Sequence, residues 1–119
     1  MEADLKHVVD EIRKEKGVDA IYLFGSAATG KQKPYSDTDI CVVTGGVADE
    51  KMILSNSSDK IDTSIFWKLP LGARFRVVKE GKPLYIRDKR KMQRLASDTV
   101  MAYLDFRPLL LRYSSRFLS

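Results

Sequence analysis

The N-terminal segment has apolar residues at helical spacing. Leu5, Val8, Val9 and Ile12 fall on one helix face, and polar residues separate them. Gly17 follows, and glycine is the usual residue just beyond a helix C-terminus. The pattern therefore predicts an amphipathic helix that ends before Gly17 and buries its apolar face.

Four short apolar runs after this helix are typical of β-strands. They cover approximately residues 20–24, 37–43, 60–66 and 83–87. Turn-forming residues separate them, including Gly25-Ser26 after the first run and Gly45-Gly46 after the second. The pattern predicts at least four strands, connected by turns and helices.

Helices are predicted between the later strands and after the last one. Asp49 could cap a short helix, and Pro70 suits the first turn of a longer helix that Gly81 ends. Asp88 could cap a long final helix with apolar residues three and four positions apart. Pro108 lies inside that pattern, so we expect a kink or a break there.

The composition fits an ordinary globular chain, since 44% of its 119 residues are hydrophobic and 31% are charged. Because the chain has only 119 residues, we expect one domain over residues 1–119, and because helices alternate with strands, we expect a layered fold. Its fold would be α/β (α+β), a small mixed sheet flanked by helices. No apolar run approaches membrane-spanning length, and the N-terminus lacks a signal-peptide pattern. We therefore expect a cytoplasmic protein that does not enter the membrane.

The charge is distributed unevenly. Residues 1–60 carry more acidic than basic side chains, whereas residues 61–119 supply the excess that gives the chain its net charge of +5. A basic C-terminal half could face a triphosphate, a nucleic acid or an acidic protein, or it could be a solvated helix face. No aromatic and basic stacking motif of RNA-binding domains is present, so nucleic-acid binding is possible but not favoured.

Two strand ends carry residues suited to phosphate chemistry. Gly25 and Ser26 end the first apolar run, and such a turn can cradle a phosphate, although a simple turn is its commoner use. Asp37 and Asp39 open the second run. Side chains alternate along a strand, so both carboxylates would project from one face, as Mg²⁺ ligands do; a strand-entry turn is the alternative.

Asp62 lies in the third predicted strand among apolar and β-branched residues. In an interior strand, such an acid needs a partner or a metal ion. If this strand lies beside the second one, Asp62 joins Asp37 and Asp39. The alternative is an exposed acid at a strand end. Three carboxylates facing a phosphate-binding turn would be suited to two-metal phosphoryl transfer.

Gly25-Ser26, a spacer of ten residues and Asp37-Thr38-Asp39 resemble the Gly-Ser-x10-Asp-x-Asp signature of the DNA polymerase beta superfamily of nucleotidyltransferases. The small size and the segment Gly81-Lys82-Pro83-Leu84-Tyr85 are similar to its minimal nucleotidyltransferase (MNT) branch. The resemblance implies a polymerase-beta-like fold and transfer of an NMP from an NTP, expected to be ATP, to a hydroxyl acceptor.

The same resemblance implies roles for individual residues. Asp37 and Asp39 would bind Mg²⁺ or Mn²⁺, and Asp62 would assist as the third carboxylate. Gly25 and Ser26 would hold the β- and γ-phosphates.

The chain departs from many family members, which carry Arg soon after the Gly-Ser pair. This chain has Ala27, Ala28 and Thr29 at those positions. Lys31 and Lys33 are the nearby cations that we expect to bind the triphosphate instead.

The MNT resemblance also implies a protein partner. Members of this branch often act as antitoxins paired with a HEPN-domain toxin, to which they can transfer a nucleotide monophosphate. A non-catalytic MNT scaffold that binds and masks its partner is the alternative. Leu104, Leu111 and Leu118 recur every seven residues. They form a second apolar stripe that we expect to bind a partner or a second copy of the chain, unless the chain end folds back over it.

Overall fold

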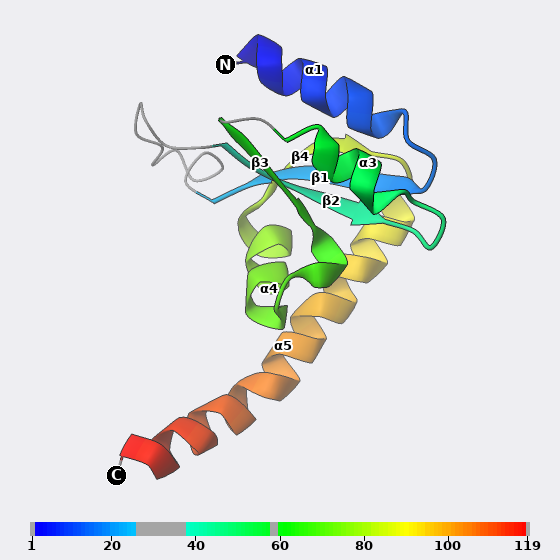
Figure 1. The fold of residues 1–119 in the computed structure, drawn as a ribbon. Helices are drawn as coiled ribbons and strands as arrows, with labels where there is room; N and C mark the ends of the chain where they lie inside the picture. Colours follow the sequence, from blue (N-terminus) through cyan, green and yellow to red (C-terminus); the bar gives the residue numbers. More distant parts are fainter. Residues whose placement is uncertain (1, 26–37, 58–59, 119) are drawn as a thin grey trace.

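Four strands form one mixed sheet at the centre of the molecule (Figure 1). The computed structural model describes residues 2–25, 38–57 and 60–118, with side chains over residues 4–105 of these ranges. The strand order is β3-β2-β1-β4. The strands are β1 (Val18–Phe24), β2 (Thr38–Thr44), β3 (Ile61–Ile65) and β4 (Lys82–Ile86). β1 runs antiparallel to β2 and β4, whereas β2 and β3 are parallel.

Helices cover both faces of the sheet (Figure 1). They are α1 (Glu2–Arg13), α3 (Glu50–Ser55), the short 3-10 helix η1 (Phe66–Lys68), α4 (Leu71–Glu80) and α5 (Lys89–Leu118). α1 and α3 pack on one face, where Ile12 and Ile53 are fully buried. α4 and α5 pack on the other face through Val77 and Met92. This arrangement confirms the predicted fold class.

The helix ends follow the capping residues that the sequence indicated. The Asp49 side chain accepts a hydrogen bond from the Met52 N–H at 3.3 Å, which starts α3. Asp88 Oδ1 accepts from the Arg90 N–H at 3.0 Å and from the Lys91 N–H at 3.2 Å. These bonds satisfy N–H groups that have no partner inside the helix, so local chemistry determines where α3 and α5 begin.

We expected a kink or a break at Pro108, and no break occurs, because α5 continues as one helix from Lys89 to Leu118. Proline removes one hydrogen bond and crowds the preceding turn, and a helix can accommodate both by bending. Figure 1 shows the axis of α5 changing direction in the orange part of the ribbon, where the helix has left the sheet.

The sole cysteine, Cys41, is a core residue of β2 with no exposed surface. Burial raises the pKa of its thiol to about 12, because the thiolate would lose its hydration in the apolar interior. Cys41 is therefore a small apolar side chain of the core. Within the described part of the chain, no helix has the length and apolar character needed to cross a membrane.

Candidate active site

Three strand ends meet where the sequence predicted phosphate chemistry. Phe24, the last residue of β1, pairs with Asp39 of β2. Asp39 in turn lies opposite Asp62 of β3 in the parallel register. β2 and β3 are therefore neighbours in the sheet. The prediction that Asp39 and Asp62 lie close together depends on this adjacency.

Both carboxylates lie on the face of the sheet that α4 and α5 cover. In β2, Thr38 and Ile40 are buried toward α1 and α3, so Asp39 between them takes the opposite face. In β3, Ile61, Thr63 and Ile65 are buried in the same way, and Asp62 alternates with them. Alternation thus directs the two carboxylates to the same side of the sheet.

Asp62 differs from the sequence expectation in its burial. It is exposed, and β3 is an edge strand. The argument that an acid in an interior strand must have a partner therefore does not apply to it. Its exposure matches the alternative considered from the sequence, and its role in catalysis stays a prediction.

Gly25 brings the turn after β1 into contact with Asp39. Its φ of +74° lies in the left-handed region, which residues with a Cβ rarely adopt. A Cβ placed on Gly25 would lie 2.8 Å from Asp39 Oδ2. The position therefore needs glycine for its conformation and for close approach to the carboxylate.

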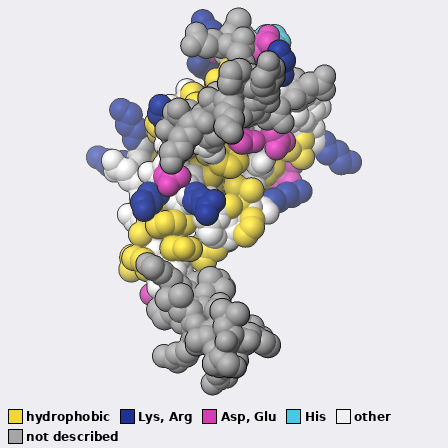
Figure 2. Space-filling view, turned by 90° about the vertical axis from the view of Figure 1, so that its left-hand side faces the viewer, with side chains coloured by type: hydrophobic (Ala, Val, Ile, Leu, Met, Phe, Trp, Pro, Cys, Tyr) yellow, Lys and Arg dark blue, Asp and Glu magenta, His cyan; other side chains and the backbone are white. Residues whose placement is uncertain are grey.

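A pocket lies beside this turn, against α4. It has a volume of about 310 Å³ and is lined by Phe24, Gly25, Ala73, Arg76 and Glu80. A second pocket, of about 440 Å³, shares its three α4 residues and extends to Phe75 and Tyr103, whose rings stack. Figure 2, which shows the side of the molecule with the strand ends and α4, has acidic and basic side chains close together over an apolar surface.

The remaining predicted site residues lie outside the described residues. They are Ser26, Lys31, Lys33 and Asp37. Among the described side chains, no group of three or more His, Cys, Asp or Glu could hold a metal ion. A three-carboxylate metal site requires Asp37 and stays a prediction. The described part of that site supplies carboxylate oxygens on one sheet face, which is the donor chemistry that suits Mg²⁺.

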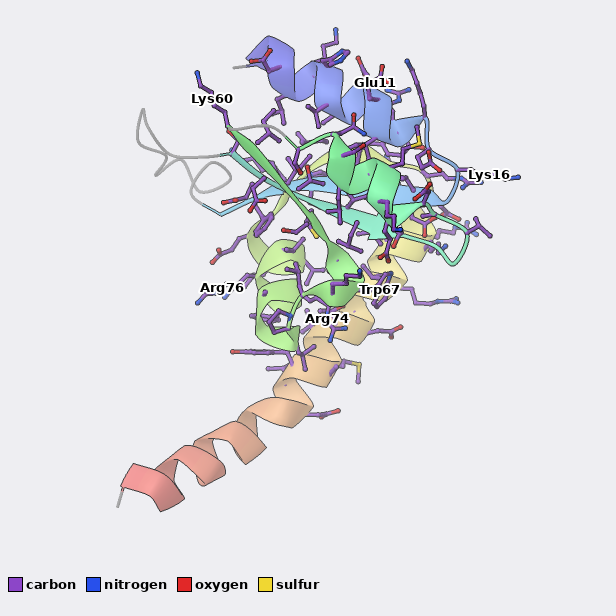
Figure 3. The ribbon with its side chains drawn as sticks, in the orientation of Figure 1. Glu11, Lys16, Lys60, Trp67, Arg74 and Arg76 are labelled. Carbon is purple, nitrogen blue, oxygen red and sulfur yellow. The ribbon has the colours of Figure 1, made fainter. Side chains whose placement is uncertain are left out.

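Sequence reasoning missed Arg76. The helix that carries it was predicted, and so was the positive charge of the C-terminal half, but neither indicates which basic side chain lies beside Gly25. Arg76 projects from α4 toward the side of the molecule where β1 ends (Figure 3). By contrast, Arg74 Nε donates a hydrogen bond to the Leu69 carbonyl at 3.1 Å.

The family follows from comparison with known proteins. Residues 6–90, more than half of the chain, match the family described as polymerase beta, nucleotidyltransferase. The chain therefore belongs to this family, and its class is that of a nucleotidyltransferase. Comparison with curated protein sequences gives no significant match.

Solved structures show the same fold. A mutant of the toxin–antitoxin MntA-HpeT aligns with a TM-score of 0.79 at 17% identity, over 96% of this chain and 98% of the other. A toxin–antitoxin with AMP-PNP gives 0.74 at 21% identity, over 99% and 98%.

A third structure is a complex from Shewanella oneidensis, a tri-AMPylated HEPN toxin with an MNT antitoxin. It gives a TM-score of 0.76 at 17% identity, over 99% of this chain and 98% of the other. The fold that the MNT resemblance implied is thus confirmed.

Proposed function

We propose that this chain is a Mg²⁺-dependent nucleotidyltransferase that transfers the NMP of an NTP, ATP by preference, to a hydroxyl group of a HEPN-type protein partner. The observation that carries the proposal is the contact of the Gly25 turn with the Asp39 carboxylate, with Asp62 in register beside it. A phosphate-binding turn and metal-binding carboxylates must lie this close to act on one triphosphate.

In this proposal, Asp37, Asp39 and Asp62 hold Mg²⁺ or Mn²⁺, which when bound neutralises charge on the phosphates and the attacking oxygen. The backbone at Gly25 and the Ser26 hydroxyl bind the β- and γ-phosphates, and Lys31 and Lys33 add positive charge. Asp62 accepts the proton of the acceptor hydroxyl. The hydroxyl oxygen forms a bond to the α-phosphorus, and the bond to the bridging oxygen breaks, so its electron pair leaves with pyrophosphate.

The exposure of Asp62 supports a large acceptor. A carboxylate on an edge strand can be reached by a hydroxyl group that projects from another protein, whereas a buried one cannot. The structurally similar toxin–antitoxin with AMP-PNP supports an adenine nucleotide as donor, and the AMPylated HEPN toxin supports a protein as acceptor.

The C-terminal helix is the proposed partner surface. α5 extends beyond the sheet and the other helices (Figure 1). Along it, Met101 is 64% exposed and Leu104 is 52% exposed, so two large apolar side chains three positions apart on the helix are open to a partner. The side chains of Leu111 and Leu118 lie outside the described residues, so their stripe stays a proposal. A homodimer through the same surface is the second possibility.

A non-catalytic scaffold that masks its partner is the competing function.

Two further expectations also stay proposals, namely one nucleotidyltransferase domain over residues 1–119 and a cytoplasmic location.

The test is a transfer assay with the product of the neighbouring gene, α-labelled ATP, GTP, CTP or UTP, and Mg²⁺. We expect the wild type to transfer label to the partner and Asp39→Asn not to do so. Both proteins should still bind the partner. Binding without any transfer of label would favour the scaffold.

A further inference from the structure

We propose that Arg76 binds the terminal phosphates of the nucleoside triphosphate and the pyrophosphate that leaves. The inference rests on the proposed function and assigns the triphosphate cation to α4. The loop after Ser26 has alanine and threonine where many family members carry arginine. A basic side chain from another element can supply the missing charge.

The pocket geometry brings Arg76 to the phosphate-binding turn. Gly25 and Arg76 line the same pocket of about 310 Å³. Gly25 also lies against Asp39, so an anion bound at Gly25 in this pocket would be close to the carboxylate that is proposed to hold the metal as well as to Arg76. A triphosphate whose metal ion is held by Asp39 would place its terminal phosphates within reach of such a cation.

Within the described part of the chain, Arg76 has no partner that would compete with a ligand. It is exposed, and its guanidinium forms no ion pair or hydrogen bond with any residue in the described part of the chain. The two neighbouring cations of α4, by contrast, each interact with another residue. Arg74 binds the Leu69 carbonyl, and Lys79 Nζ lies 5.7 Å from the centroid of the Phe75 ring.

Glu80 provides a second test of phosphate binding at this pocket. It lines the same pocket four residues after Arg76 on α4, yet no ion pair joins these two described residues. Its negative charge opposes binding of a phosphate, and Arg76 offsets this effect. Arginine suits the role because its planar guanidinium can donate two parallel hydrogen bonds to phosphate oxygens. Removal of Arg76 and removal of the Glu80 charge should therefore change nucleotide affinity in opposite directions.

The experiment measures the dissociation constants of ATP and AMP, each with Mg²⁺, from thermal melts over a nucleotide concentration series. We expect Arg76→Gln to weaken ATP binding by roughly 10- to 100-fold, the range for a lost hydrogen bond to a charged group. AMP lacks the terminal phosphates, so its affinity should not change. Glu80→Gln should tighten ATP binding by up to about fivefold.

Arg94→Gln is the matched control. It removes the same charge from the start of α5, where Arg94 lines a different pocket with Asp88 and Lys91. Lys91 in turn binds Asp19, near the opposite end of β1 from Gly25. We expect Arg94→Gln to leave both affinities unchanged, and all variants without nucleotide to melt like the wild type.

The outcomes separate this inference from the proposed function. If the wild type binds ATP and Arg76→Gln binds it equally well, or loses ATP and AMP affinity alike, Arg76 does not bind the terminal phosphates, while the proposed function stands. If the wild type binds no nucleotide, the proposed function fails and this inference fails with it.

Discussion

Gly25→Ala tests the contact between the turn after β1, which we propose binds phosphate, and the Asp39 carboxylate, which we propose holds the metal ion. An L-residue in the left-handed region is strained by about 1–2 kcal/mol. Alanine also restricts the unfolded chain relative to glycine, which offsets about 0.4–1 kcal/mol of that strain. At a φ of +74°, we therefore expect a net loss of about 1 kcal/mol in the free energy of unfolding.

The new methyl group also displaces Asp39. The 2.8 Å approach to Oδ2 must lengthen to at least 3.4 Å for ordinary contact, a shift of 0.6 Å. Oδ2 is the end of a side chain that can rotate, so this shift adds little to the stability loss. It moves a carboxylate that we propose holds the metal ion, however, and misplacement of a catalytic group on the order of 1 Å costs about 10²-fold in rate. We expect transfer activity to fall by roughly 10- to 100-fold.

Two assays separate these effects. Urea unfolding should show a midpoint lowered by about 0.5 M for Gly25→Ala, and the labelled-ATP assay should show the loss of transfer. The control is Gly46→Ala, because Gly46 is exposed and a Cβ there meets nothing within 4 Å. An unchanged urea midpoint would refute the strain argument, and unchanged activity would refute the argument that the turn positions Asp39.

Three further predictions concern the carboxylates, the partner surface and the core. Asp39→Asn should lower transfer activity by at least about 10²-fold, which is the scale for loss of a key electrostatic group. The urea midpoint should not change. Transfer activity close to that of the wild type would exclude a metal-binding role for Asp39. Leu104→Glu with Leu111→Glu should abolish association with the partner in size-exclusion chromatography, whereas Val47→Glu, at a side chain that is 75% exposed, should not. The pKa of Cys41 is raised from 9.0 to about 12 in the folded chain. The stability that the folded chain gains from keeping the Cys41 thiol neutral is therefore complete below pH 9 and is lost as the pH rises toward 12. Cys41→Ala should lessen the fall in urea midpoint over that range, and an identical fall in both proteins would contradict this reasoning.

Periodicity predicted much of the fold and part of the site. Side-chain alternation along the second predicted strand indicated one face for its carboxylates, and in the structure Asp39 takes the face opposite the buried Thr38 and Ile40. The capping residues Asp49 and Asp88 marked helix starts, because a cap depends on neighbours within three residues. Local chemistry is readable from sequence wherever the interacting groups lie in one element.

Tertiary arrangement accounts for what the sequence did not predict. The exposure of Asp62 depends on β3 being an edge strand, and strand order follows from how distant segments pair. Arg76 lies beside Gly25 only because α4 packs across β1, about fifty residues away along the chain. The helix pattern around Pro108 could not indicate whether bending or breaking would relieve the proline.

The path between β2 and β3 determines which face of the sheet α3 covers. α3 joins these two parallel strands and packs on the α1 face, through Ile53. Connections of this kind are right-handed almost without exception, since L-amino acids twist strands and helices in one sense. The opposite hand would carry α3 across to the face of Asp39 and Asp62. The absence of α3 from the face that carries Asp39 and Asp62 is thus a consequence of backbone chirality, before any side chain of the site is specified.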